Sequence, residues 1–259
     1  MTFALVIVVL LALGIAQRLL DRDNFAHWSV TVSLKKGHQK TLARHFKFYQ
    51  VLPKKSQKIF EYRVAKFMIL KDYIPRQMES VTEEMKVLIA ASAIQLTFGF
   101  PRVFLSYFKY IIVYPDQFFS TTAQRYHKGE VNPKAKAIVL SWRHFTEGYA
   151  QAEGQNLGLH EMAHALELEN KVMNHEYDFL DSDAIDAWQR LAALEIKKLR
   201  EGGGSIFREY GGTNHHEFFA VTVEYFFERP GDFMDYHRDL YRAMANLLRQ
   251  DPIRLYSKI

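Results

Sequence analysis

The chain contains the sequence His160-Glu161-Met162-Ala163-His164, in which two histidines lie four residues apart. On an α-helix with 3.6 residues per turn, side chains at this spacing project from one face, so the two imidazoles can bind a single zinc ion. Glu161 lies beside that face, where its carboxylate can take a proton from a water that the metal activates. The motif predicts a zinc site with His160 and His164 as ligands and Glu161 as general base.

The residues around the motif favour a metal site over a chance match. Residues 157–168 would be apolar on almost every side of a helix, with Asn156 as its N-cap and Asn170 as a stop. A helix of this composition is expected to be buried, and buried polar side chains are costly without partners. Core histidines that hydrogen-bond to the backbone are the alternative, and the combination of residue types favours zinc over it.

A third protein ligand has to come from another element, because catalytic zinc has three protein ligands and one open position. Residues 215–228 are predicted to form a helix that ends before Pro230. Glu217 and Glu224 are seven residues apart, hence on roughly one face, and both lie among apolar residues. One of these carboxylates could bind zinc while the other orients a histidine.

The composition limits the other kinds of site. With 259 residues and 48% hydrophobic content, the chain can bury a substantial core in one large domain or two intimate ones. Cysteine is absent, which excludes disulfides, thiolate zinc sites and cysteine nucleophiles. Any metal must therefore use histidine and carboxylate ligands. No segment resembles a helix or sheet that reads nucleic acid, so no nucleic-acid partner is expected.

The N-terminus is predicted to contact a membrane. Residues 3–16 are an uninterrupted apolar stretch at or below the usual spanning length, which favours a short anchor within residues 1–20. A secretory signal is the alternative, but residues 1–2 lack Lys and Arg. Residues 17–76 carry 14 Lys and Arg against 4 Asp and Glu, a net charge of +10. Such residues tend to stay cytoplasmic and to attract anionic lipids, although they could equally form a solvated helical surface.

Other segments give weaker structural predictions. Helices are expected over residues 52–73, over residues 80–96 with a capping box from Ser80 to Glu83, and over residues 181–200 before three glycines. Those glycines could form a lid, although a plain connector is favoured. Strands are expected over residues 110–114 and 137–142. The second strand could line a cleft and pair with an extended peptide, or it could be an ordinary core strand.

Taken together, these segments resemble the zinc peptidases of the Mlc titration factor A type, whose catalytic core is similar to the protease domain of anthrax lethal factor. The resemblance covers most of the chain after the apolar stretch. It is carried by residues 63–67, 111–115, 139–142, 159–166, 217–221 and 224–227.

The resemblance implies an α+β, zincin-like fold with a small mixed sheet packed on helices in residues 21–259, after the anchor at 1–20. It makes Glu217 the third zinc ligand, as in gluzincins, and Glu224 a supporting or structural residue. It also places Tyr210 near the metal, where a phenol can donate a hydrogen bond to an oxyanion. The implied function is that of an aminopeptidase-like peptidase. The alternative is a regulatory protein that binds a transcriptional repressor and in which zinc is mainly structural.

We expect the protein to be membrane-associated through its N-terminal segment, with a cytoplasmic catalytic domain that acts on peptide or protein substrates. A soluble cytoplasmic protein and a secreted protein are the alternatives.

Overall fold

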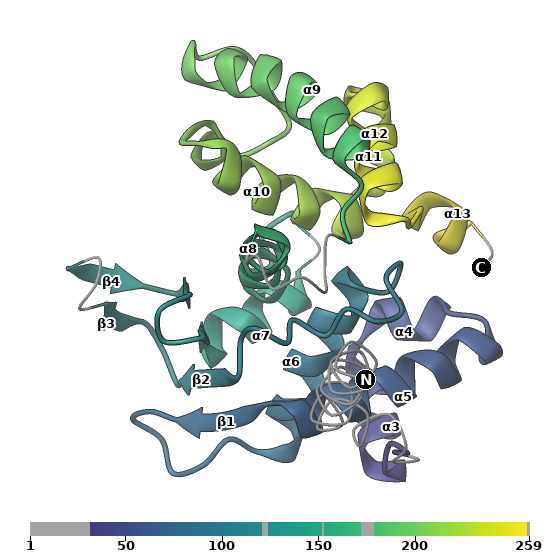
Figure 1. Cartoon of the computed structure of the whole chain (residues 1–259), viewed down its shortest axis with the longest axis vertical. Coiled ribbons are helices and arrows are strands. Elements are labelled where there is room, and N and C mark those ends of the chain that lie inside the picture. The colour runs from purple at the N-terminus through teal and green to yellow at the C-terminus, as the bar shows by residue number, and fades with distance from the viewer. Residues whose placement is uncertain (1–31, 121–123, 152, 172–178, 258–259) are drawn as a thin grey trace, which may run out of the picture. The chain divides into compact units, whose positions relative to one another are not determined.

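The computed structural model describes residues 32–120, 124–151, 153–171 and 179–257. Residues 34–259 form one compact unit, in which a small mixed sheet packs with helices in an α+β fold (Figure 1). The expected α+β class with a small mixed sheet is therefore confirmed. The predicted anchor at residues 1–20 lies outside the described residues. In the described ranges, no helix has both the length and the apolar composition that a membrane crossing requires.

Four of the described strands form the main sheet, in the order β1 (Asp72–Pro75), β2 (Tyr110–Tyr114), β6 (Ala137–Ser141) and β5 (Gly129–Asn132). The first three are parallel, and β5 runs antiparallel to β6 at the edge. Every residue of β6 is buried and both of its sides are already paired, so residues 137–142 cannot also pair with a peptide. The alternative of a core strand was right, and the edge that borders the site belongs to β5.

A separate hairpin and a set of helices complete the described structure. In the hairpin, β3 (Phe118–Ser120) pairs antiparallel with β4 (Arg125–His127). The helices are α3 (Lys36–His45), α4 (Lys47–Val51), α5 (Lys54–Leu70), α6 (Glu83–Leu96), α7 (Trp142–Ala150), α8 (Leu157–Lys171), α9 (Ser182–Arg200), α10 (His215–Glu228), α11 (Pro230–Tyr236), α12 (Arg238–Leu248) and α13 (Pro252–Tyr256), and η1 (Glu209–Gly212) is a 3₁₀ helix.

The central helix is α8, which contacts the sheet on one side and α10 on the other (Figure 1). Its N-terminus is fixed by Asn156, whose Oδ1 accepts a hydrogen bond from the Leu159 backbone N–H at 2.9 Å. Close packing also depends on Gly158, because a methyl group there would lie 2.6 Å from the Phe145 ring and 2.8 Å from Ser92 Oγ. The helix that carries the histidine motif is thus held between layers of the core.

Two predicted helix boundaries differ from the structure. The cap of α6 is Thr82, whose side chain accepts a hydrogen bond from the Met85 N–H, so the capping box from Ser80 was wrong. The helix predicted over residues 52–73 ends at Leu70, and the chain continues from Lys71 directly into β1. The second difference arises because residues 72–75 pair with β2, so the backbone becomes extended before the helical sequence pattern ends.

Candidate metal centre

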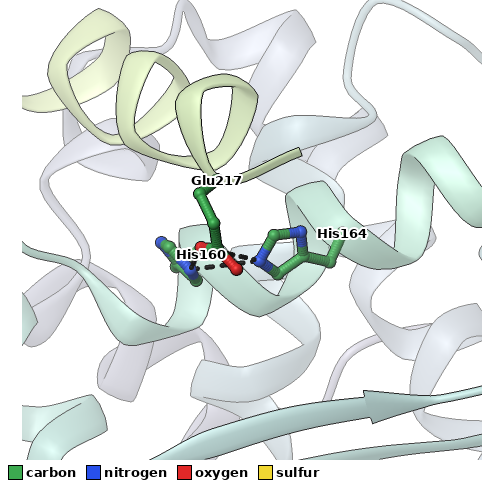
Figure 2. A group of neighbouring side chains, drawn as sticks. All are labelled: His160, His164 and Glu217. Atoms are coloured by element: carbon green, nitrogen blue, oxygen red, sulfur yellow. Dashed lines mark hydrogen bonds and ion pairs between the residues drawn. The ribbon is translucent and has the colours of Figure 1, made fainter. Parts of the chain in front are cut away.

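His160, His164 and Glu217 come together where α8 packs on the first turn of α10 (Figure 2). The Nε2 atoms of the two imidazoles are 3.1 Å apart. Glu217 Oε2 lies 3.2 Å from Nε2 of His160 and 3.5 Å from Nε2 of His164. Figure 2 shows all three side chains pointing toward one another from the two helices.

This triangle of atoms has the dimensions of a zinc site. Tetrahedral zinc with bonds of about 2.0–2.1 Å separates its ligand atoms by about 3.3 Å, which lies within the range of the three distances. Among the residues that the structure describes, Glu217 Oε2 is buried and accepts no hydrogen bond of normal geometry. A buried carboxylate oxygen that faces two imidazole nitrogens is therefore better explained by a shared cation than by hydrogen bonding. The side chains present fit the ion.

The cap of α10 places Glu217 in this position. Asn214 Oδ1 accepts a hydrogen bond from the Glu217 backbone N–H at 3.0 Å, so Glu217 lies in the first turn of the helix. Almost every later residue of α10 is buried, which forces the helix against the core and against α8. The structure thus brings a carboxylate 53 positions further along the chain to the two histidines.

Glu224 lies behind His160 rather than among the ligand atoms. Its Oε1 is 2.7 Å from Nδ1 of His160 and also accepts a hydrogen bond from Arg208. Its Oε2 accepts a hydrogen bond from the backbone N–H of Asn156. The carboxylate favours the tautomer in which Nδ1 carries the proton, which leaves Nε2 of His160 free to bind a metal. Of the two glutamates considered for the third ligand, Glu217 occupies the ligand position and Glu224 the orienting one.

The carboxylates also set the protonation of the cluster. Burial lowers the pKa of His160, but the adjacent carboxylates of Glu217 and Glu224 outweigh this effect and raise the pKa to about 10. Burial raises the pKa of Glu217, yet the two imidazoles hold it well below its usual range. In the absence of a cation, the cluster therefore keeps a proton that a metal would have to displace.

Glu161 lies next to the histidines, with its carboxylate against the edge strand. The residue is 5% exposed, and a methyl group at Gly129 of β5 would lie 2.3 Å from its Oε1. Glycine at the start of β5 is therefore what allows this close approach. Burial raises the pKa of Glu161, and the neighbouring imidazoles of His160 and His164 offset part of that rise.

Tyr210 is on η1, which contacts α10. Its ring centroid is 6.2 Å from that of His160, and the side chain is half exposed toward the open side of the site. Burial and the nearby Glu217 carboxylate raise the pKa of Tyr210 to about 12, so the phenol keeps its proton at neutral pH and can donate a hydrogen bond.

Two cavities lined by described residues border this group. The larger, of about 630 Å³, is bordered by Arg125, Tyr126, Lys128 and Arg208. The smaller, of about 350 Å³, is bordered by Glu130. Both are lined by His160, Glu161, Tyr210 and Gly129, so the site borders a cleft whose wall includes β5.

Sequence reasoning missed two contributors to the site. Arg208 binds Glu224 from the segment before η1, and nothing in its local sequence distinguishes it from other surface arginines. Gly129 is separated from Glu161 by 32 positions, and only the packing of β5 on α8 brings the two together. A lone glycine between Lys128 and Glu130 is by itself a weak turn signal.

Several known proteins are similar in sequence to this chain over much of its length. An uncharacterised protein of Synechocystis sp. is 27% identical over 237 residues, which cover 83% of this chain and 84% of that protein. Mlc titration factor A of Edwardsiella ictaluri is 27% identical over 207 residues, covering 72% and 77%. Mlc titration factor A of Salmonella arizonae is 32% identical over 122 residues, covering 44% and 48%.

The model of one metallopeptidase family, described as glucose-regulated metallo-peptidase M90, matches residues 23–249. This match spans most of the chain and includes the paired histidines, the edge strand and both glutamates of α10. The resemblance inferred from the sequence is thereby confirmed, and the protein belongs to the glucose-regulated metallo-peptidase M90 family.

Proposed function

We propose that the protein is a zinc-dependent peptidase in which His160, His164 and Glu217 hold the metal and Glu161 is the general base. The observation that supports it best is the triangle of two imidazole nitrogens and one carboxylate oxygen, with edges of 3.1, 3.2 and 3.5 Å. Its residue types are those of the gluzincin class, and on the same grounds we assign the α+β unit to the zincin-like folds.

Each residue of the site has a separate task in this proposal. A zinc ion bound there would polarise the scissile carbonyl and lower the pKa of water. Glu161 accepts the proton of the attacking water and delivers it to the nitrogen of the leaving amine. Tyr210 donates a hydrogen bond to the carbonyl oxygen as negative charge develops on it. Glu224 and Arg208 hold the ring of His160 in place.

The edge strand favours a peptide substrate. Within the described sheet, β5 pairs only with β6, and its residues line both cavities beside Glu161. An extended peptide can add to such an edge through main-chain hydrogen bonds, which would place one of its carbonyl groups near the proposed metal. By family resemblance we propose aminopeptidase-like cleavage of short peptides.

The test combines metal analysis with cleavage of a mixed peptide library. Glu161→Gln is expected to retain the bound zinc of the wild type and to lose cleavage, because the amide cannot accept the proton. Wild-type protein stripped with a chelator and then reloaded with zinc is the control that links cleavage to the metal. A Glu161→Gln protein that cleaves peptides normally, once contaminating proteases are excluded, would contradict the assigned role.

The resemblance to the Mlc titration factor A type, a name that two of the relatives carry, supports a second candidate function, in which the chain binds a transcriptional repressor and zinc is mainly structural. The same variant separates the two functions. If Glu161→Gln supports every cellular effect of the wild type, binding carries the function. If the cellular effect disappears while the protein stays folded and keeps zinc, catalysis carries it.

We also propose that residues 1–20 attach the protein to a membrane, with the catalytic unit on the cytoplasmic side. The support is the apolar stretch at residues 3–16 followed by the basic segment. If a chain lacking residues 1–20 fractionates as the full-length chain does, this localisation is wrong.

A further inference from the structure

The helices that follow the apolar stretch carry an unbalanced positive charge. Residues 35–60 contain eight Lys and Arg and no Asp or Glu. Within the described part of the chain, no acidic side chain forms an ion pair with Lys40, Arg44, Lys54, Lys55 or Lys58, all of which are exposed. Uncompensated charge of this density attracts an anionic partner.

Large hydrophobic side chains are exposed beside these lysines. Successive residues of a helix turn by about 100 degrees, so positions 55, 58, 59, 62 and 69 of α5 fall within an arc of about 100 degrees. Ile59 is 48% exposed, Tyr62 36% and Ile69 59%. We define the α5 outer face as Lys54, Lys55, Lys58, Ile59, Tyr62 and Ile69.

Glu61 of α5, the first acidic residue after this basic segment, holds the adjoining helices α3 and α4 against α5. Glu61 accepts hydrogen bonds from Gln39 of α3 at 2.8 Å and from Tyr49 of α4 at 2.6 Å. Both carboxylate oxygens of Glu61 are thus engaged with neutral partners, and they hold α3 and α4 against α5. The cations of the three helices therefore belong to one part of the molecular surface.

We propose that the α5 outer face rests on the surface of an anionic lipid bilayer. Lysines attract lipid phosphates, while isoleucine and tyrosine side chains between them can enter the boundary between headgroups and acyl chains. Nucleic acid would be served by the lysines alone and would gain nothing from exposed isoleucines. The apolar stretch at residues 3–16 ends only 19 positions before Lys35, so a bilayer that holds that stretch is within reach of this face.

The inference is independent of the proposed catalysis. The α5 outer face contributes none of the residues that line the two cavities or hold His160. Its side chains are exposed, so substitutions there are expected to leave the fold and the metal centre intact.

The test measures how full-length protein partitions into vesicles of phosphatidylcholine alone and of phosphatidylcholine with about 30 mol% phosphatidylglycerol. The wild type should prefer the anionic vesicles, and this preference should weaken with salt. Each lysine near the surface contributes about fivefold, so Lys54→Gln, Lys55→Gln and Lys58→Gln together should reduce the preference on the order of a hundredfold. A triple variant Lys134→Gln, Arg190→Gln and Lys197→Gln makes the same change in net charge at exposed positions elsewhere.

A second variant, Ile59→Ser with Ile69→Ser, should weaken partitioning into both kinds of vesicle while keeping the anionic preference. The proposal is overturned if the α5 lysine variant keeps the wild-type preference, or if the control variant loses as much. It is equally overturned if the α5 lysines are required to bind duplex DNA at the same ionic strength but not to bind vesicles. Peptide cleavage measured in parallel separates these outcomes from failure of the proposed enzyme.

Discussion

Replacing Glu224 with glutamine removes one of the two acceptor oxygens of a side chain whose three hydrogen-bond partners are all donors. His160 Nδ1 and Arg208 donate to Oε1, and the backbone N–H of Asn156 donates to Oε2. A carboxylate offers an acceptor oxygen on both sides, whereas an amide offers an oxygen on one side and an NH₂ group on the other. No orientation of the glutamine can therefore satisfy all three donors.

Both orientations of the amide have a cost. If the NH₂ group faces Asn156, two donors meet in a buried place, which costs about 1–3 kcal/mol of stability. If it faces His160, the imidazole must move its proton to Nε2, which then cannot bind a metal. The first orientation is the cheaper one, and it also removes the negative charge that makes His160 a strong ligand. We expect Glu224→Gln to weaken zinc binding by about 10–100-fold, or about 1.4–2.7 kcal/mol.

The assay is a zinc titration against a competing chelator, together with denaturant unfolding of the metal-free protein. Glu228→Gln is the matched control, because Glu228 lies one turn further along α10 and accepts hydrogen bonds from Asn156 Nδ2 at 2.9 Å and Gly154 N at 2.8 Å without touching His160. This control should keep the wild-type zinc affinity. The reasoning fails if Glu224→Gln binds zinc like the wild type, or if both variants lose the same affinity.

Three further predictions concern the base, the phenol and a titrating carboxylate. Gly129→Ala should retain zinc but lose most peptide cleavage, because its methyl group would displace Glu161; normal cleavage would contradict this. Tyr210→Phe should lower kcat about 10²–10³-fold with little change in metal content, and a change in KM alone would point to substrate binding instead. Burial raises the pKa of Glu228 from 4.5 to about 7, so the folded state holds this proton more tightly. The free energy of unfolding should therefore fall by at most about 3 kcal/mol as the pH rises from 4.5 to 7. Denaturant unfolding at a series of pH values measures this decrease, which the Glu228→Gln variant should not show.

Local patterns were sufficient to predict the helices that carry the site. The helix predicted around the paired histidines is α8, and its cap is Asn156 as expected. The helix predicted over residues 215–228 has those bounds as α10. The strand predicted over residues 110–114 is β2. In each case an apolar run is bounded by a capping residue or proline, and this information lies within one short window of sequence.

The wall of the cleft could not be predicted in the same way. The edge strand β5 has the sequence Gly-Glu-Val-Asn, and with one large apolar residue it shows no alternation that indicates a strand. It forms because β6 offers an unpaired side, and the register that sets Gly129 opposite Leu140 is decided by that pairing. Its proximity to Glu161 is a property of the assembled sheet and α8.

The roles of the two glutamates of α10 also depend on tertiary structure rather than on local sequence. The sequence left open which of Glu217 and Glu224 would face the histidines, since seven residues place both on one face of α10. The structure separates them by depth, with exposed side-chain fractions of 18% for Glu217 and 2% for Glu224. A carboxylate as deeply buried as Glu224 is costly unless every oxygen is paired, and apolar residues of similar volume would often be as stable there. Its cluster of donors is therefore better explained by the need to orient His160 than by stability.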